Sequence, residues 1–368
     1  MFSLHIDTAR TWRGGQNQVL VTVLGLRALG HRTLLVANPI GELRQRAKEG
    51  LDLLPLAPKT EMDLNAAWRL SRIVKQLRPD VLHAHDPHGV AMAALALSMS
   101  TQLAKPPLVA SRRVDFHLRR SSLSRWKYRQ VDCFVCASEA IRQMLIADGV
   151  PEVRAVVVHE GVDLGHIDAA PVATLHQDLW LPHEAPVVGN VAALVPHKGQ
   201  RHLIEAATLV LPQVPDARFV IAGEGELRPA IERQIREHRL EKHVLLAGFR
   251  PDVLSLHKAF DLFVMSSLTE GLGTSVIDAM ACGKPVVATT AGGIPELVVE
   301  GETGFLVAPR DHQAMARAIT ILLKDEALRR RMGEAGRTRA RLRFSAERMV
   351  QETLRVYHRV AMHPHQEA

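Results

Sequence analysis

Short apolar runs of strand character alternate with helical patterns over nearly the whole chain of 368 residues. Amphipathic stretches separate most of these runs; one of them, 17–29, repeats apolar positions at helical spacing and stops at Gly30. Such alternation predicts an α/β fold, in which helices connect the parallel strands of a sheet. The runs in the first half of the chain are "SLHIDT" (3–8), "TLLVAN" (33–38), "VLHAHD" (81–86), "LVASRR" (108–113) and "CFVCAS" (133–138).

The pattern breaks at 162–186, where prolines and mixed polarity indicate a linker, and then resumes. Because the chain is longer than one hydrophobic core usually serves, we expect two doubly wound, Rossmann-like domains that face a ligand across a cleft. The second series of strand-like runs is "VVGNVAAL" (187–194), "RFVIAG" (218–223), "HVLLAG" (243–248), "LFVMSS" (262–267), "PVVATT" (285–290) and "GFLVAP" (304–309).

The expected boundaries follow from these two series. They are an amino-terminal domain over 1–165, a linker over 166–186 and a carboxy-terminal domain over 187–344. Residues 345–368 are expected to form a terminal helix that packs back on the amino-terminal domain, followed by a loose tail.

Composition indicates an ordinary globular protein, with 47% hydrophobic and 23% charged residues. Three cysteines cannot form a disulfide framework, which favours a reducing compartment, and we interpret Cys133 and Cys136 as buried thiols because no second pair accompanies them. The opening residues lack the pattern of a signal peptide, and the longest apolar stretch, 89–104, is too short and too polar to span a bilayer. We therefore expect a cytoplasmic protein.

The net charge of +7 predicts an anionic partner. An aromatic content of 4% argues against the stacking platforms of proteins that bind single-stranded nucleic acid. One basic cluster, 328–343, has the spacing of a solvated helix face. The other, 111–129, is expected on a loop, where Trp126 and Tyr128 accompany the arginines that we predict to meet an acceptor or an anionic membrane surface: Arg112, Arg113, Arg119 and Arg120.

The stretch "TEGLGTSVIDAMACGKPVV" (269–287) places two carboxylates around a glycine-rich turn. A capping box of Ser275 and Asp278 would explain the second carboxylate but not Glu270. A ligand explains both, because Gly271 and Gly273 allow close backbone approach and the following helix offers N–H donors to a diphosphate.

The order of several motifs resembles the donor-binding signature of the retaining glycosyltransferases of family 4, which have the two-domain GT-B fold. "EGLG" with "AMACGKPVVATTAGGIPELV" carries the resemblance most strongly. The other matching segments are "WRGGQNQ" (12–18), "VLHAHD" (81–86), "VHEGVD" (158–163), "VAALVPHKGQRHLIEAA" (191–207), "VIAGEGEL" (220–227) and "LLAGFRPDV" (245–253).

The resemblance implies three catalytic residues. Lys198 would neutralise the donor diphosphate, Glu270 would hold the hydroxyls of the transferred sugar, and His85 would meet that sugar near the bond being broken. Asp278 would hold the ribose, and Arg250 would lie near the base, mainly through its backbone. The remaining donor-binding residues that the resemblance implies are Gly14, Gly15, Gln16, Gly223, Gly271, Leu272, Gly273 and Thr274.

The resemblance implies no cofactor and no metal, because Lys198 and a helix terminus supply the positive charge. Taken alone, His83 and His85 are typical of core histidines, and a metal site would need a third ligand, for which Asp86 is a weak candidate. Two departures stand out: Ala193 occupies the position of the family's usual arginine, and Asp278 replaces a glutamate. Arg112 or Arg113 is a hypothetical substitute for the missing arginine.

The sequence therefore predicts an enzyme that transfers a sugar, with retention, from a nucleoside diphosphate sugar to a glycan or lipid-linked acceptor. Lipopolysaccharide or another cell-envelope glycan fits the basic cluster, with the enzyme peripheral on the inner face of the cytoplasmic membrane. Two alternatives stay open: a nucleotide-sugar epimerase or hydrolase on the same fold, and a non-catalytic nucleotide-sugar-binding protein. A nucleic-acid-binding protein would rest on charge alone.

Overall fold

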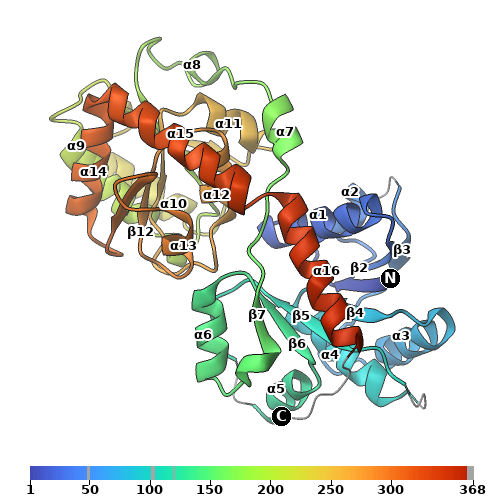
Figure 1. Ribbon diagram of the computed structural model, residues 1–368. Coiled ribbons are helices and arrows are strands. Elements are labelled where there is room, and N and C mark those ends of the chain that lie inside the picture. The colour runs from blue at the N-terminus through green and yellow to red at the C-terminus, as the bar shows by residue number, and fades with distance from the viewer. Residues whose placement is uncertain (48–49, 101–103, 119–120, 363–368) are drawn as a thin grey trace. The chain divides into compact units, whose positions relative to one another are not determined.

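A computed structural model describes residues 1–47, 50–100, 104–118 and 121–362 (Figure 1). The chain folds into two compact units, the first formed by Met1–Gly161 with the C-terminal stretch from Ala346, and the second by Val162–Ser345. Each unit is built on one parallel sheet, which confirms the expected α/β fold class.

The sheet of the first unit has seven parallel strands in the order β3-β2-β1-β4-β5-β6-β7. The order reverses between β1 and β4, which lie side by side with Leu4 opposite Leu82 and His5 opposite His83. The strands are β1 (Phe2–Asp7), β2 (Arg32–Ala37), β3 (Leu53–Pro55), β4 (Val81–Ala84), β5 (Leu108–Arg112), β6 (Cys133–Cys136) and β7 (Ala155–Val157).

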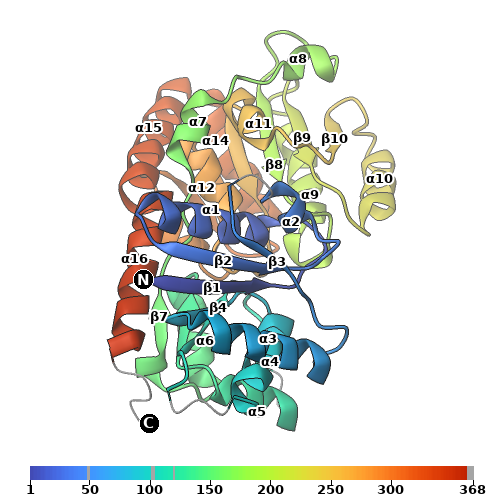
Figure 2. The ribbon, with the colours of Figure 1, turned by 90° about the vertical axis from the view of Figure 1, so that its right-hand side faces the viewer.

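Helices cover both faces of this sheet (Figure 2). One face carries α1 and α16, whose apolar residues, Leu26 and Val350 among them, pack on strand residues such as Val109. The opposite face carries α3 and α4 (Figure 2). The helices are α1 (Gly14–Ala28), α2 (Glu42–Arg46), α3 (Leu64–Leu77), α4 (Pro87–Ser98), α5 (Ser122–Arg129), α6 (Glu139–Ala147) and α16 (Ala346–Met362), with a short 3₁₀ turn, η1 (Glu152–Arg154).

The sheet of the second unit has six parallel strands in the order β10-β9-β8-β11-β12-β13, which reverses between β8 and β11. Each of its strands lies within a strand-like run that the sequence predicted. They are β8 (Val187–Val191), β9 (Arg218–Ala222), β10 (Val244–Gly248), β11 (Leu262–Met265), β12 (Val286–Thr289) and β13 (Gly304–Val307).

The core of the second unit lies where α9 and α14 pack on this sheet, with Leu203, Ile204 and Ile319 against Phe219 and Val264. Of the other helices, α7 and α8 precede the first strand of this sheet, and the rest connect or follow its strands. The helices are α7 (Leu164–Ala169), α8 (Leu175–Asp178), α9 (Gln200–Val210), α10 (Arg228–Glu237), α11 (Val253–Ala259), α12 (Thr274–Ala281), α13 (Ile294–Leu297), α14 (His312–Lys324) and α15 (Glu326–Arg343), with a 3₁₀ turn, η2 (Pro196–Lys198).

The boundaries differ from the expected ones at the linker. The stretch 166–186 belongs to the second unit, where it forms most of α7 and all of α8, and the first unit ends at Gly161. Two edge strands, β3 and β7, were not predicted, because each is only three residues long. The final helix lies with the first unit, as expected, where α16 packs on α1.

In the part of the chain that the structure describes, no helix combines the length and the apolar character that crossing a membrane requires. The apolar stretch 89–104 contributes most of α4, whose Val90, Met92 and Ala94 are buried in the first unit.

Candidate active site

In the second unit, two loops follow the strands at which the sheet order reverses. One runs from the end of β8 to Lys198, and the other runs from the end of β11 to Glu270. Doubly wound sheets bind ligands outside the carboxyl ends of such strands. The topology therefore places Lys198 and Glu270 at the favoured edge of this sheet.

These two side chains are in direct contact. Lys198 Nζ lies 2.5 Å from Glu270 Oε2, and Ser267 Oγ donates a hydrogen bond of 3.0 Å to the same oxygen. The side chains of Lys198 and Glu270 are 18% and 12% exposed. Both bonds end on Oε2, so that, among the described residues, Oε1 of Glu270 is left to accept from a ligand.

The backbone around Glu270 is held by glycines. Gly292 has φ +52, and a side chain there would bring its Cβ to 1.6 Å from the carbonyl oxygen of Glu270. Gly273, with φ +100, is the N-cap of α12. Gly271 and Leu272 are buried beside it, and Thr274 is the first residue of the helix.

The capping-box interpretation of Asp278 is wrong. The helix begins after Gly273, and no side chain among the described residues caps its N-terminus. Ser275 lies inside the first turn rather than at the N-cap. Asp278 lies in the second turn of α12 and is half-buried. Its expected contact with a ribose stays a prediction.

The other predicted residues of the second unit lie at the ends of neighbouring strands. Gly223 directly follows β9. Arg250 follows β10, where its guanidinium donates two hydrogen bonds to Asp252, of 2.8 and 2.7 Å, and lies 3.5 Å from Asp178. Because the guanidinium of Arg250 is already bonded to these two acids, any contact of Arg250 with a nucleobase would be made by its backbone. Ala193 carries no charge, and its carbonyl accepts from Gln200 Nε2.

In the first unit the corresponding edge lies at the ends of β1 and β4. Asp7 is the last residue of β1, and His85 directly follows β4. Gln16, at the start of α1, donates from Nε2 to Asp7 Oδ2 at 3.1 Å, and its Oε1 accepts from the backbone N–H of Arg13. Gly14 and Gly15 form the first turn of this helix, so that the predicted amino-terminal turn lies beside Asp7.

Burial, reinforced by the neighbouring Asp86, raises the pKa of Asp7 to about 6. The hydrogen bond from Gln16 opposes this shift but does not cancel it. Sequence analysis did not single out Asp7, because an acidic residue at a strand end carries no signal of its own.

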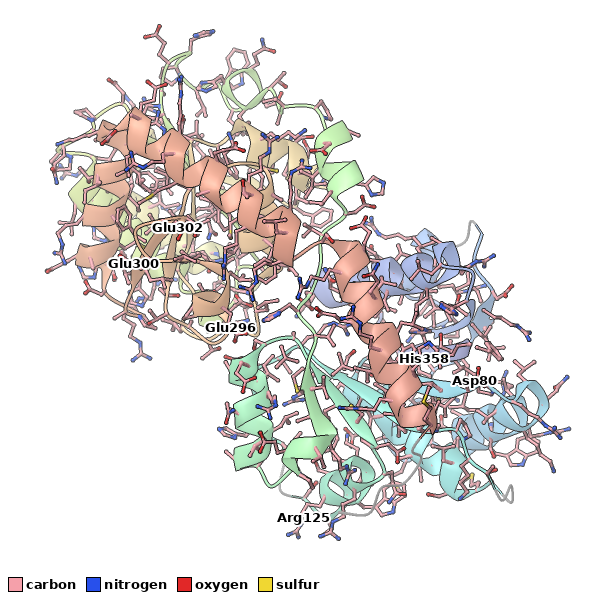
Figure 3. All side chains as sticks on the ribbon, in the orientation of Figure 1. Asp80, Arg125, Glu296, Glu300, Glu302 and His358 are labelled. Carbon is pink, nitrogen blue, oxygen red and sulfur yellow. The ribbon has the colours of Figure 1, made fainter. Side chains whose placement is uncertain are left out.

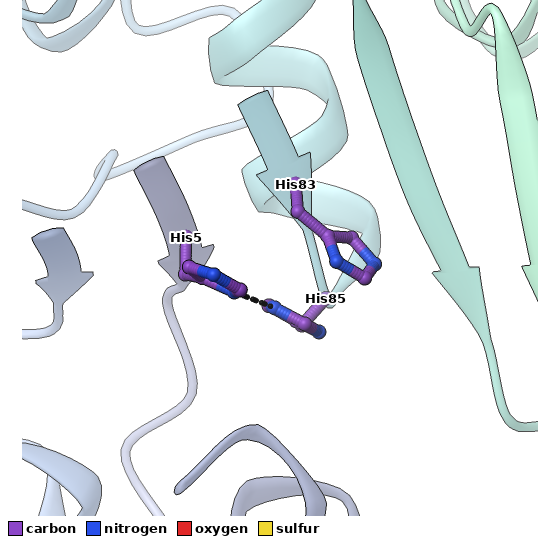
Figure 4. A group of neighbouring side chains, drawn as sticks. All are labelled: His5, His83 and His85. Atoms are coloured by element: carbon purple, nitrogen blue, oxygen red, sulfur yellow. Dashed lines mark hydrogen bonds between the residues drawn. The ribbon is translucent and has the colours of Figure 1, made fainter. Parts of the chain in front are cut away.

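His85 lies in a cluster with His5 and His83, all buried (Figure 4). His5 Nδ1 and His85 Nε2 are 3.0 Å apart, and the two rings are stacked. Burial lowers the pKa of His5 to about 3 and also holds the pKa values of His83 and His85 well below the ordinary value. The three imidazoles are therefore neutral at physiological pH.

Arg113 determines which nitrogen of His85 carries the proton. Its guanidinium lies 3.3 Å from His85 Nδ1, and its Nε lies 3.1 Å from Glu160 Oε1. A guanidinium can only donate, so Nδ1 of neutral His85 accepts and Nε2 holds the proton. His85 Nε2 then donates to His5 Nδ1, and His5 Nε2 donates to Ser3 Oγ at 3.0 Å.

The same logic extends to the C-terminal helix. Ser111 Oγ lies 3.2 Å from His85 Nδ1 and 2.8 Å from His83 Nε2, and the hydroxyl of Tyr357 lies 2.5 Å from His83 Nδ1. A consistent assignment has Tyr357 donating to His83, His83 donating to Ser111, and Ser111 donating to His85. Both ring nitrogens of His85 are thus engaged, and its ring must exchange a partner before it can bond a sugar.

This cluster supplies the third histidine that sequence analysis lacked, but its arrangement does not fit a metal ion. All six ring nitrogens have partners within the protein. The guanidinium of Arg113 directly faces His85, so a divalent cation would be placed beside a largely covered positive charge, on a side chain that is 17% exposed.

The basic cluster differs from the expected exposed loop. Arg112 is the last residue of β5 and is buried, with its guanidinium donating to the carbonyl of Phe116. Arg113 points into the first unit, to Glu160 and His85. Neither side chain is placed to meet a membrane surface. Arg119 and Arg120 lie outside the described residues, and the following segment is helix α5, in which Arg125 and Arg129 are exposed.

Cys133 and Cys136 are buried, as expected, and three positions apart on β6. Residues at this spacing face opposite sides of a sheet, so the two thiols do not form one site.

Several residues of the site were missed from the sequence. Ser267 precedes the recognised motif by two residues, and Tyr357 lies in the terminal helix, far from any motif. Only the pairing of β1 with β4 brings His5 beside His83. These contacts depend on tertiary structure and leave no local pattern.

Comparison with known proteins gives two family matches, one for each part of the chain. Residues 12–166 match the family described as Glycosyltransferase Family 4, and residues 172–339 match Glycosyl transferases group 1. EpsD of Bacillus subtilis (strain 168) is 29% identical over 318 residues, which cover 82% of each chain. The lipopolysaccharide core biosynthesis glycosyltransferase LpsE of Rhizobium meliloti (strain 1021) is 29% identical over 280 residues, which cover 76% of each chain.

Among solved structures, HepE of Anabaena in complex with UDP has a TM-score of 0.84 at 22% identity, covering 98% of this chain and 100% of that chain. HepE has also been solved with UDP-glucose. Two matching families cover successive parts of the chain, and the fold agrees over nearly its whole length. The protein is a member of the family 4 glycosyltransferases, with two Rossmann-like units of GT-B architecture.

Proposed function

We propose that this glycosyltransferase moves a sugar, with retention of anomeric configuration, from a nucleoside diphosphate sugar to a cell-envelope glycan or lipid-linked acceptor. The observation that supports the proposal most is the contact of Lys198 and Ser267 with Glu270 at the turn that opens α12. A cation and a helix N-terminus can stabilise a departing diphosphate, and an oriented carboxylate can hold the sugar that it leaves.

Lys198 would stabilise the departing diphosphate. Its ammonium group has three N–H donors, of which the contact with Glu270 uses one. Negative charge builds on the leaving group in the transition state, so a fixed cation there lowers the barrier more than it tightens ground-state binding.

Glu270 would act on the sugar. Glycosyl transfer passes through a state in which the ring gains oxocarbenium character, and a nearby carboxylate favours that positive charge. With Oε2 fixed by Lys198 and Ser267, Oε1 is oriented to accept from sugar hydroxyls.

The first donor to test is a UDP-sugar. HepE shares the fold and has been solved with UDP and with UDP-glucose, and LpsE acts in lipopolysaccharide core biosynthesis. Catalysis in this proposal needs no bound metal, so transfer should continue in EDTA.

The deciding experiment supplies UDP-, GDP- and ADP-sugars together with a membrane extract as acceptor and determines the product linkage by NMR. We expect acceptor-dependent transfer with the donor's anomeric configuration. Consumption of donor at the same rate without acceptor would favour the epimerase or hydrolase instead. Tight donor binding without turnover of any kind would favour the non-catalytic alternative.

A membrane-borne acceptor would be met by the basic surface around α5. Arg125 and Arg129 are exposed on this helix, where Figure 3 labels Arg125, and Arg119 and Arg120 precede it in sequence. Replacing both Arg119 and Arg120 by Glu should weaken sedimentation with anionic liposomes and leave nucleotide binding unchanged. Wild-type protein that stays in the supernatant at low salt would exclude the membrane role.

A further inference from the structure

A second group of metal-ligating side chains lies in the second unit, apart from Lys198 and Glu270. It consists of His202 and Glu205 on α9 and His312 at the first position of α14. His202 Nδ1 lies 2.8 Å from Glu205 Oε2, and His312 Nδ1 lies 3.5 Å from the same oxygen. One donor atom of each residue lies within 4.8 Å of the other two.

These separations suit a transition metal. A tetrahedral Zn²⁺ site has bonds of about 2 Å to nitrogen and oxygen, which puts its ligand atoms about 3.3 Å apart. The observed separations of 2.8 and 3.5 Å fall on either side of that value, so small rotations of the side chains bring three ligands to one ion.

Burial of the group is graded. The side chain of His202 is 10% exposed, that of Glu205 is 24% exposed and that of His312 is 38% exposed. An ion bound by all three would therefore be covered by protein on one side, with its fourth position open to water. Three protein ligands with one open position form a recurrent zinc arrangement.

The electrostatic setting contrasts with that of the buried histidine cluster of Figure 4. There, Arg113 faces the imidazoles, and the cluster itself contains no carboxylate. Here, a carboxylate is one of the three ligands, and the neighbouring cation, Arg201, is 68% exposed and lies 3.5 Å from the other oxygen of Glu205. The charge of a divalent ion would thus be partly neutralised by Glu205 at this group, whereas Arg113 would repel the ion at the histidine cluster.

The scaffold is rigid on both sides. His202 and Glu205 are three residues apart on one helix, which places them on the same face. Asp311 caps α14 by accepting from the backbone N–H of Ala314, which fixes the turn that carries His312. The two helices pack together on the sheet of the second unit.

We propose that His202, Glu205 and His312 bind Zn²⁺ and join the beginning of α9 to the beginning of α14. Lys198 lies two residues before the first residue of α9, so the bound ion stabilises the segment that carries Lys198. The ion itself takes no part in sugar transfer in this proposal. This proposal does not depend on the proposed function.

Calorimetric titration of untagged protein with ZnCl₂, in buffer free of chelators, tests the site. We expect His312→Ala and Glu205→Gln each to weaken one Zn²⁺ equivalent by at least about tenfold. His312 is the most exposed ligand, so its replacement leaves the core intact. MgCl₂ should produce no binding, because Mg²⁺ selects oxygen ligands in octahedral geometry.

The matched control is His166→Ala. His166 Nδ1 lies 2.8 Å from Asp163 Oδ2 at the same spacing of three residues, but no third ligand joins this pair among the described residues. Zinc affinity should be unchanged in this variant. Absence of Zn²⁺ binding, or equal binding by wild type and His312→Ala, overturns the proposal. Thermal melting gives a second readout, since Zn²⁺ should raise the melting temperature of wild type but not of His312→Ala.

Discussion

Lys198 and Glu270 owe their contact to the sheet, because each follows one of the two strands at which the strand order of the second unit reverses. In the proposed mechanism the two charges have different roles: Lys198 stabilises the leaving diphosphate, whereas Glu270, whose Oε2 is held by Lys198 and Ser267, acts on the sugar. We therefore expect substitutions of Glu270 to lower the rate of sugar transfer more than the affinity for the nucleotide.

Glu270→Gln tests this directly. The substitution keeps the size of the side chain but removes the charge that favours an oxocarbenium-like ring, so kcat should fall by about 10²-fold while UDP affinity stays within a few-fold. Steady-state kinetics and calorimetry measure the two effects separately. Glu302→Gln, at an exposed acid labelled in Figure 3, is the control. Retention of more than half of the wild-type activity would refute the role of Glu270.

His257 is a second residue with a distinct prediction. It is fully buried against Phe260 and Phe263, and neither ring nitrogen has a hydrogen-bond partner among the described residues. Unpaired buried polar groups destabilise a fold, so His257→Leu should raise the free energy of unfolding at pH 7 by about 1 kcal/mol. Urea denaturation monitored by circular dichroism measures the change, and a large loss of stability would contradict this view of the site.

The same variant should change the pH dependence of stability. Burial lowers the pKa of His257 from 6.5 to about 3, so between these values the unfolded chain binds a proton that the folded chain does not. Wild-type stability therefore falls as pH falls from 6.5 towards 3, and the His257→Leu variant should lose up to about 1.4 kcal/mol less per pH unit. Asp7, whose raised pKa acts in the opposite sense below pH 6, is common to both proteins and cancels in the comparison. Parallel curves would disprove the assignment.

At the scale of elements, the sequence predicted eleven strand-like runs, and each of them overlaps a strand of the structure, with boundaries that agree to within a few residues. A short, continuous apolar run with turn residues on either side is typical of a strand that is buried on both faces of a parallel sheet. The two missed strands, β3 and β7, are three-residue edge strands, and β3 ends in proline. The formation of such short edge strands depends on pairing with the neighbouring strand more than on their own residues.

The return of α16 to the first unit gives the prediction at this scale. A Cβ added at Gly25 of α1 would lie 2.5 Å from Cγ2 of Val350 on α16. Gly25→Ala should therefore lower the free energy of unfolding by about 1–3 kcal/mol, although alanine favours helices. Adding Val350→Ala should recover part of the loss, because it removes the methyl group that clashes.

Chemical denaturation of wild type, the two single variants and the double variant measures how strongly the effects of the two substitutions on the free energy of unfolding depend on each other. Additive effects of the two substitutions would show that α1 and α16 do not meet at this point.

At the scale of the whole molecule, the order of the motifs predicted the family, and the comparisons confirmed it. The sequence did not predict how the site residues are supported. Ser267, Asp7, Arg113 and Tyr357 act through contacts between strands or helices that are far apart in sequence. It also assigned Arg112 to an exposed surface, because arginine at the end of a buried strand looks the same in sequence as arginine in a loop.

If Lys198 holds the diphosphate of a nucleotide sugar, as we propose, its loss must weaken nucleotide binding, which calorimetric titration measures. UDP, GDP and ADP are compared on wild type, and the nucleotide that binds most tightly is then titrated into Lys198→Ala. The control is Lys258→Ala, because the ammonium group of Lys258 donates to the backbone carbonyls of Asp168 and Ala170 in the same unit. We expect Lys198→Ala to weaken binding by at least about tenfold, the effect of one lost charge-assisted bond, and Lys258→Ala to bind like wild type. Equal affinity of wild type and Lys198→Ala for the nucleotide would contradict it.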